Sequence, residues 1–224
     1  NGVDYSEWRT TNNPYLAAPY HADDLAGKNI CKQFLQKEVG LPVSNAPLFG
    51  TVSRLAEQKG ISVLVEALAD ILCENEMQYV GLGSGDGQLA GQLKSLQSRF
   101  PKQVRFVEGY SNALAHQIEA GADYFVMPSR FEPCGLNQLY SLRYGTIPIV
   151  NGVGGLVDTV IDISHDKPTG LVLNQLTVQA LSDALKKACS VHGSEQLREM
   201  AQRGMKADFG WANASTHYLN CYKK

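Results

Sequence analysis

The sequence lacks a strong charge imbalance and lacks any long apolar run. Its 20 Lys and Arg are offset by 22 Asp and Glu, for a formal net charge of −2. Nucleic acids and anionic membrane surfaces select a clear cationic excess, so neither is an expected partner. No stretch approaches the roughly 18 consecutive apolar residues of a membrane-spanning helix, so no membrane partner is expected either.

The sequence also lacks a cysteine pattern. Its 5 cysteines include no two with the short spacing of a zinc site, and an odd number argues against a closed disulfide framework. We therefore expect unpaired thiols, no metal and a reducing compartment. The first residues, Asn1 to Tyr5, contain no initiator Met and no signal-peptide pattern, so we expect the chain to begin inside a longer protein.

Three segments follow one another along the chain. Residues 1–46 form a lead-in or interdomain segment with one helix, capped by Asp24 or its neighbour and ending at Gly40. Residues 47–193 form the main domain, and residues 194–224 are typical of two C-terminal helices. The apolar residues that we expect to face inward from the lead-in helix are Leu25, Ile30, Phe34, Leu35 and Val39.

Short apolar runs alternate with longer amphipathic stretches throughout the main domain. This alternation predicts an α/β domain with a doubly wound parallel sheet of the Rossmann-like type. The expected strands are Leu48–Val52, Tyr79–Leu82, Val104–Val107, Tyr124–Met127, Ile147–Val150 and Leu171–Leu173. The expected helices lie near residues 60–74, 87–99, 112–120, 136–144, 155–162 and 177–191.

Ligands of such sheets bind at the carboxyl ends of the strands, where loops lead into helices. The first such junction carries Arg54 and Lys59. A fork-shaped guanidinium and a compact ammonium can hold one diphosphate from two sides. The alternative is a solvated loop in which Glu57 pairs with one of the cations.

Two further junctions are less specific. The glycine-rich run Gly81–Gly87 matches neither a Walker loop nor a dinucleotide fingerprint, and it is best interpreted as a tight turn in which Asp86 caps the next helix. Tyr110 follows another strand and can either stack on a flat base or pack locally. His116 lies inside the helix after it, where a structural role is the more common one.

The densest junction is Met127–Gln138. Gly135 allows the backbone to approach a ligand closely, and the N–H groups at Leu136 and Asn137 are expected at a helix start that suits an anion. Glu132 places a carboxylate beside this site, which makes sense if it faces a sugar. Cys134 has no evident His partner and is interpreted as a pocket wall.

A further glycine pair, Gly154-Gly155, precedes another helix and suits close backbone contact with phosphate or sugar oxygens.

These motifs together resemble the glycogen and starch synthases of the bacterial and plastid type, which have the GT-B fold. The resemblance spans essentially the whole chain, and its most specific part is the run Ser129–Leu136. Other matching segments are Asn1–Asp4, Leu25–Lys28, Ser53–Leu55, Gln58–Gly60, Leu82–Asp86, Ala120–Asp123, Tyr144–Thr146, Gly154–Leu156 and Asp158–Val160. The resemblance implies that the chain is the C-terminal, donor-binding half of such an enzyme.

The resemblance also implies a reaction: glucose passes from ADP-glucose to the non-reducing end of an α-1,4-glucan, with retention and without a metal or cofactor. The implied catalytic residues are Arg54 and Lys59, which bind the diphosphate, and Glu132, which contacts the glucose. Tyr110 is implied to stack on the adenine. The remaining residues expected to bind substrate are Ser53, Gly109, Cys134, Gly135, Leu136, Asn137, Gly154 and Gly155.

The chain departs from the family pattern in two ways. Val153 stands where the family usually has Thr, which removes a hydroxyl contact with the donor. The family's Lys-x-Gly-Gly-Leu loop and its sugar-binding His belong to a second domain and do not occur in this sequence. We therefore expect the chain to be inactive alone and to meet the glucan through the other domain, toward which the helices of residues 194–224 would pack. We also expect it to reside in the bacterial cytoplasm or the plastid stroma.

Two other functions remain compatible with the sequence. One is a different retaining GT-B transferase that uses a UDP-sugar, including the sucrose-type enzymes. The other is a nucleotide-binding module without catalytic activity.

Overall fold

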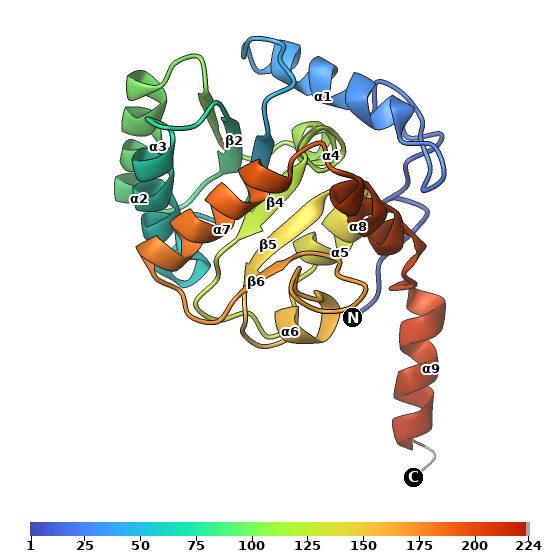
Figure 1. The fold of residues 1–224 in the computed structure, drawn as a ribbon. Coiled ribbons are helices and arrows are strands. Elements are labelled where there is room, and N and C mark those ends of the chain that lie inside the picture. Colours follow the sequence, from blue (N-terminus) through green and yellow to red (C-terminus); the bar gives the residue numbers. More distant parts are fainter. Residues whose placement is uncertain (223–224) are drawn as a thin grey trace.

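A computed structural model describes residues 1–222 of the chain, apart from the side chain of residue 217. It contains one six-stranded parallel sheet with the order β3-β2-β1-β4-β5-β6 (Figure 1). The strands are β1 Leu48–Val52, β2 Gln78–Gly83, β3 Val104–Glu108, β4 Tyr124–Met127, β5 Ile147–Asn151 and β6 Leu171–Leu173. The predicted doubly wound α/β sheet is confirmed, and each strand lies where the sequence predicted it.

Helices connect and flank the strands. They are α1 Ala26–Glu38, α2 Ile61–Ile71, α3 Gly87–Arg99, α4 Asn112–Gly121, α5 Asn137–Arg143, α6 Leu156–Thr159, α7 Val178–Val191, α8 Glu195–Lys206 and α9 Trp211–Tyr222, with a 3-10 turn, η1, at Glu57–Lys59. Asp86 caps α3 as predicted, since its carboxylate accepts hydrogen bonds from the N–H groups of Gln88 and Leu89. The last two residues of the expected C-terminal segment, 223–224, lie outside the described residues.

Helix α6 is shorter than the predicted helix at 155–162. The chain leaves the helix at Val160 and pairs instead with a later segment. The N–H of Thr169 donates to the carbonyl of Ile161 at 2.9 Å, and Asp162 forms a β-bridge with Gly170. This pairing with a segment eight residues further along the chain accompanies the early end of the helix.

Side chains alternate between the two faces of the sheet, as strand geometry requires. On one face, Phe49 and Tyr124 pack with α2, α3 and α7, and on the other face Leu48 and Phe125 pack with α1 and α4. Gly50 allows α4 to lie directly on β1, because a Cβ at this position would sit only 2.6 Å from a methyl carbon of Ile118.

The predicted inward face of α1 is wrong for two residues. Ile30 is 51% exposed and Phe34 is 38% exposed, whereas the polar residues Lys32 and Gln36 are buried. Lys32 Nζ contacts Asp123 Oδ2 at 2.6 Å, and Gln36 Nε2 donates to Gln78 Oε1 at 2.7 Å. These buried polar contacts with the sheet set the rotation of the helix, which apolar periodicity alone did not reveal.

The first residues are fastened to the body of the domain. The N–H of Val3 donates to the carbonyl of Phe209 at 2.7 Å, and the Trp8 ring stacks on Tyr140 at 3.6 Å. Helix α9 then extends away from the body (Figure 1). Its exposed large apolar residues are Trp211, Tyr218, Leu219 and Tyr222.

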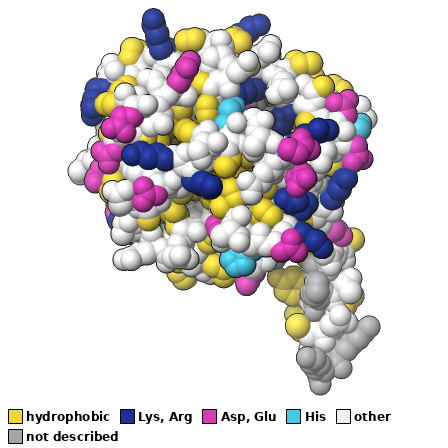
Figure 2. All heavy atoms as spheres, in the orientation of Figure 1, with side chains coloured by type: hydrophobic (Ala, Val, Ile, Leu, Met, Phe, Trp, Pro, Cys, Tyr) yellow, Lys and Arg dark blue, Asp and Glu magenta, His cyan; other side chains and the backbone are white. Residues whose placement is uncertain are grey.

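Charged side chains of both signs are interspersed on the face drawn in Figure 2, in keeping with the small net charge. Among the described residues, no helix combines the length and the apolar character needed to span a bilayer.

We predict that Lys32→Met lowers the free energy of unfolding by about 3 kcal/mol, because Asp123 would keep a largely buried negative charge without its cation. Lys37→Met, on the exposed side of the same helix, is the matched control and should change stability by less than about 0.5 kcal/mol. Urea denaturation of both variants gives the comparison. Equal small effects would show that the ion pair does not anchor α1.

Candidate active site

The strand order places two loops side by side. The order reverses between β1 and β4, which are neighbours in the sheet although far apart in sequence. The loop after β1 carries Arg54 and Lys59, and the loop after β4 carries Ser129 and Glu132. A doubly wound sheet opens a crevice at this reversal, and ligands bind there.

A cavity of about 180 Å³ lies at this reversal. Four of the predicted site residues line it, namely Ser53, Arg54, Lys59 and Asn137, together with Ser129. The structure therefore brings the two predicted cations and the start of α5 into one concavity. Among the described residues, Arg54 has no ion-pair partner.

The two loops are joined along their backbones. The N–H of Arg130 donates to the carbonyl of Gln58 at 2.8 Å, and the side chain of Gln58 donates to the carbonyl of Phe131 at 3.0 Å. Gly60 has a φ of +67° and lies so close to the carbonyl of Pro128 that a Cβ would overlap the oxygen. The position of one loop thus determines the position of the other.

An ion pair connects the loops at the cavity. Lys59 Nζ contacts Glu132 Oε2 at 2.5 Å, and Ser129 Oγ donates to the same oxygen at 3.0 Å. Glu132 is 7% exposed, so the carboxylate is held by these donors rather than by bulk water. The pair places a carboxylate directly against a cation that the sequence assigned to phosphate.

The alternative partner for the cations of the first loop is not used. Glu57 pairs with Arg130 at 2.7 Å, not with Arg54 or Lys59. The Arg130 guanidinium and the Ser62 hydroxyl lower the pKa of Glu57. Glu57 therefore neutralises neither Arg54 nor Lys59, and both cations line the cavity, with Lys59 paired to Glu132.

The segment after β5 supports the backbone of Glu132. The N–H of Gly155 donates to the carbonyl of Glu132 at 3.2 Å, and Gly154, with a φ of +51°, lies against that carbonyl. Asn151 Nδ2 donates to the carbonyl of Ser129 at 2.9 Å. The two predicted glycines therefore hold the carboxylate loop in place, in addition to any contact with a ligand.

The start of α5 follows the predicted glycine. Gly135 has a φ of +74°, which favours glycine, and Leu136 directly precedes the first helical residue. The N–H groups of a first helical turn have no acceptor within the helix.

The Asn137 side chain donates to the carbonyl of Val52 at 2.6 Å, so its amide is engaged with the main chain. Cys134 Sγ contacts the carbonyl of Gly135 at 3.2 Å.

Tyr110 and Gly109 lie at the same edge of the sheet but not in this cavity. They follow β3, which is separated from β1 by β2, and Tyr110 is 83% exposed. The ring is thus available to a ligand that extends along the edge.

Val153 packs against the apolar cluster under the site, where a Thr would place a hydroxyl.

His116 has a structural environment. It is fully buried, its Nδ1 lies 2.8 Å from the Tyr144 hydroxyl, and the Trp8 ring stacks on it at 4.1 Å. Burial lowers the pKa of His116 to about 4, so the imidazole is neutral at physiological pH. It does not reach the cavity of Lys59.

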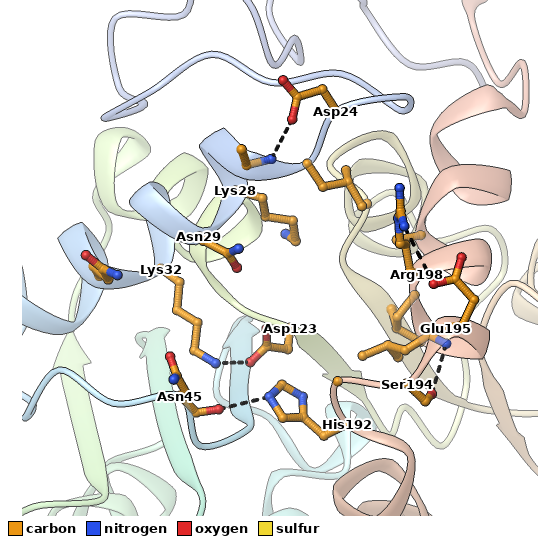
Figure 3. Close-up of a pocket in the computed structure, with 18 of the residues that line it drawn as sticks. Asp24, Lys28, Asn29, Lys32, Asn45, Asp123, His192, Ser194, Glu195 and Arg198 are labelled. Atoms are coloured by element: carbon orange, nitrogen blue, oxygen red, sulfur yellow. Dashed lines mark hydrogen bonds and ion pairs between the residues drawn. The ribbon is translucent and has the colours of Figure 1, made fainter.

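A larger cavity, of about 630 Å³, lies at the amino ends of the strands, opposite the candidate site (Figure 3). Most of its charged lining residues are already paired with one another. Lys32 pairs with Asp123 at 2.6 Å and Arg198 pairs with Glu195 at 3.6 Å. Its size therefore does not make it the better candidate, since few charged groups are left for a ligand.

Three supporting residues were not among the predicted site residues. Gln58 and Asn151 hold the backbone of the Glu132 loop, and Ser129 donates to its carboxylate. Asn151 carries a visible signal, since it is a polar residue at the end of an otherwise apolar strand. Within residues 1–222, no three His, Cys, Asp or Glu side chains are grouped so as to hold a metal.

We predict that Gly154→Ala lowers the free energy of unfolding by at least about 1 kcal/mol, because Ala is strained at a positive φ and its Cβ would overlap the Glu132 carbonyl. Gly91→Ala is the control, since Gly91 lies inside α3 with open space around it. That change should stabilise the domain by about 0.5–1 kcal/mol. Thermal unfolding of both variants measures the difference, and a neutral Gly154→Ala would contradict the proposed support of Glu132.

Known proteins resemble this chain both in sequence and in fold. The glycogen synthase of Thioalkalivibrio sulfidiphilus is 47% identical over 230 residues, which cover 100% of this chain and 48% of that protein. The catalytic domain of starch synthase IV from Arabidopsis thaliana, solved with ADP and acarbose, superimposes with a TM-score of 0.92 at 34% identity, over 100% of this chain and 48% of that chain.

A sucrose-phosphate synthase from Thermosynechococcus elongatus is less similar, with a TM-score of 0.66 and 26% identity over 84% of this chain and 47% of that chain. The chain spans about half the length of the relatives that it matches. The family model of glycosyl transferases group 1 matches residues 32–207, which is most of the chain. The chain therefore belongs to the group 1 glycosyl transferase family.

Proposed function

We propose that this chain is the donor-binding half of a retaining glucosyltransferase, a glycogen or starch synthase that transfers glucose from ADP-glucose to the non-reducing end of an α-1,4-glucan. The observation that carries the proposal is the contact of Lys59 with Glu132 at a cavity that Arg54 also lines. The names of the relatives support the glucan, and the ADP in the starch synthase structure supports the nucleotide.

Arg54 and Lys59 are suited to hold the diphosphate of the donor. Negative charge grows on the diphosphate as the bond to the sugar breaks, so cations at this position stabilise the transition state more than the ground state. The N–H groups before α5, at Gly135 and Leu136, offer neutral donors to the same phosphates. Asn137, Gly154 and Gly155 shape the backbone around them.

Glu132 is suited to the sugar rather than to the phosphates. A carboxylate repels a phosphate, but it accepts hydrogen bonds from glucose hydroxyls and stabilises positive charge at the anomeric carbon. Before the donor binds, Lys59 balances this carboxylate at 2.5 Å. The diphosphate would then compete with this carboxylate for Lys59 and draw the ammonium toward the departing phosphate.

Tyr110 is suited to the adenine. Its ring is 83% exposed. Tyr110 follows β3, and β2 separates this strand from β1, which precedes Arg54. An exposed aromatic ring can stack on a flat base with little loss of side-chain freedom. Ser53, Gly109 and Cys134 complete the proposed contacts with the donor.

The rest of the site belongs to another part of a longer protein in this proposal. A cavity of about 180 Å³ is smaller than the ~300–1,000 Å³ that usually encloses a small-molecule ligand. We infer that residues 47–193 bind the donor, that residues 1–46 lead in from the other half, and that α9 packs on it through its exposed apolar residues. That half would hold the glucan, so the chain alone would be inactive, and the whole enzyme would act in the bacterial cytoplasm or plastid stroma.

We predict that the 224-residue chain binds ADP and ADP-glucose more tightly than UDP and UDP-glucose in titration calorimetry. Tyr110→Ala should weaken ADP binding about 5- to 10-fold, because it removes a stacking contact of about 1 kcal/mol. A clear preference for UDP would instead favour a UDP-sugar transferase. A folded chain that binds none of these nucleotides would contradict the whole proposal.

We also predict that Arg54→Ala and Lys59→Ala each weaken ADP binding about 10- to 100-fold, since each removes a charge-assisted contact worth about 1.5–3 kcal/mol. Lys187→Ala is the matched control, because Lys187 is an exposed cation on α7, outside the residues that line the cavity. It should leave the affinity unchanged. An equal effect of all three changes would point to nonspecific attraction of the anion.

A further inference from the structure

One oxygen of the carboxylate in the candidate site is shared by two donors of different kinds. Glu132 Oε2 accepts from Lys59 Nζ at 2.5 Å and from Ser129 Oγ at 3.0 Å. These are its donors among the described residues. Ser129 is 1% exposed and Glu132 is 7% exposed, so water does not readily replace either contact.

The two donors differ in how freely they can move away from the Glu132 carboxylate. Lys59 lies at the end of a 3-10 turn, lines the cavity and has a side chain with several rotatable bonds. Ser129 follows β4 at a distance of two residues, and Asn151 Nδ2 fixes its backbone by a hydrogen bond of 2.9 Å to its carbonyl. An anion in the cavity can draw Lys59 away, whereas the held backbone of Ser129 keeps this residue beside Glu132.

We propose that Ser129 is a positioning residue that acts through Glu132, and that Asn151 supports it. When the ammonium of Lys59 turns to the diphosphate, the Ser129 hydroxyl keeps Glu132 Oε2 oriented and the carboxylate ionised. This inference rests on the proposed function, because the ligand that draws Lys59 away is the donor of that function. The Ser129 hydroxyl contributes little to the stabilisation of the Glu132 carboxylate while Lys59 contacts it. This contribution grows when Lys59 has moved away.

The argument follows from the balance of charge at a buried carboxylate. Burial favours the neutral acid, and hydrogen bonds to the ionised form oppose that effect. With two donors on Oε2, the loss of the hydroxyl leaves the ammonium to hold the charge. With the hydroxyl alone, its loss leaves a buried carboxylate with neither of its two donors on Oε2. A purely structural serine would have the same effect in both situations.

The test is a double-mutant cycle on the Glu132 pKa, measured by NMR titration of the 224-residue chain labelled with carboxyl-¹³C glutamate. The signal is assigned by its loss in Glu132→Gln. In the Lys59→Ala background, Ser129→Ala should raise the pKa of Glu132 by about one pH unit or more, the value of one hydrogen bond to a charged group. With Lys59 present, the same change should raise it by less than half as much. Equal shifts in both backgrounds, or none, would overturn the proposal.

A second arm uses the ligand. Saturating ADP should enlarge the effect of Ser129→Ala in the same way as Lys59→Ala does, because both remove the ammonium from Glu132. If ADP binds but the effect does not grow, the positioning role in the bound state is wrong. If ADP does not bind, the proposed function fails, while the cycle without ligand still decides whether Ser129 holds the carboxylate.

Two variants control for damage to the fold. Ser129→Thr keeps the hydroxyl and should restore the Glu132 pKa, whereas Ser129→Cys has nearly the original size but a weaker donor and should raise the pKa by an intermediate amount. Ser141→Ala is the matched control, since the buried Ser141 hydroxyl contacts the carboxyl group of another buried acid, Glu119, at 2.8 Å. It should leave the pKa of Glu132 unchanged. A Glu132 shift in Ser141→Ala, or a full shift in Ser129→Thr, would assign the effect to general loosening of the core.

Discussion

The candidate site depends on the contact between Lys59 and Glu132. The two residues are 73 positions apart in the chain and meet because β1 and β4 are neighbours at the point where the strand order reverses. Backbone hydrogen bonds between their loops, and the close approach of Gly60 to Pro128, set the distance. The ammonium of Lys59 and the carboxylate of Glu132, 2.5 Å apart, form an ion pair with no net charge. An incoming anion that takes the ammonium therefore leaves the carboxylate without its counter-ion.

The same principle, a buried charge held by a few specific partners, recurs away from the site. The ion pair of Lys32 with Asp123 holds α1 against the start of β4. Burial raises the pKa of Glu119 to about 8, so this carboxyl group is mostly protonated at neutral pH. Burial also lowers the pKa of Lys28 to about 8, but most of its ammonium keeps its charge at neutral pH and contacts the Ala120 carbonyl and the Thr146 hydroxyl. Such contacts add little net stability compared with apolar packing, but they favour one orientation of each element over its alternatives.

The comparison with relatives changes how the cavity is understood. The chain spans about half the length of the proteins that it matches, and its cavity at the strand reversal is small. A small site with cations, a carboxylate and an exposed aromatic ring at the carboxyl ends of the strands is consistent with the proposal that it forms one wall of a cleft. The larger cavity at the amino ends of the strands has more room but pairs most of its charges internally, which explains why size alone is a poor guide here (Figure 3).

Local sequence patterns were enough to predict the six strands, the cap at Asp86 and the junctions where Arg54, Lys59 and Glu132 lie, because apolar alternation, glycine and proline act through neighbouring residues. The folded structure was needed to find that Lys59 is the cation that meets Glu132, that Glu57 pairs with Arg130, and that α1 buries Lys32 instead of Ile30. These outcomes depend on which distant segments the strand order brings together, and no local pattern contains that information.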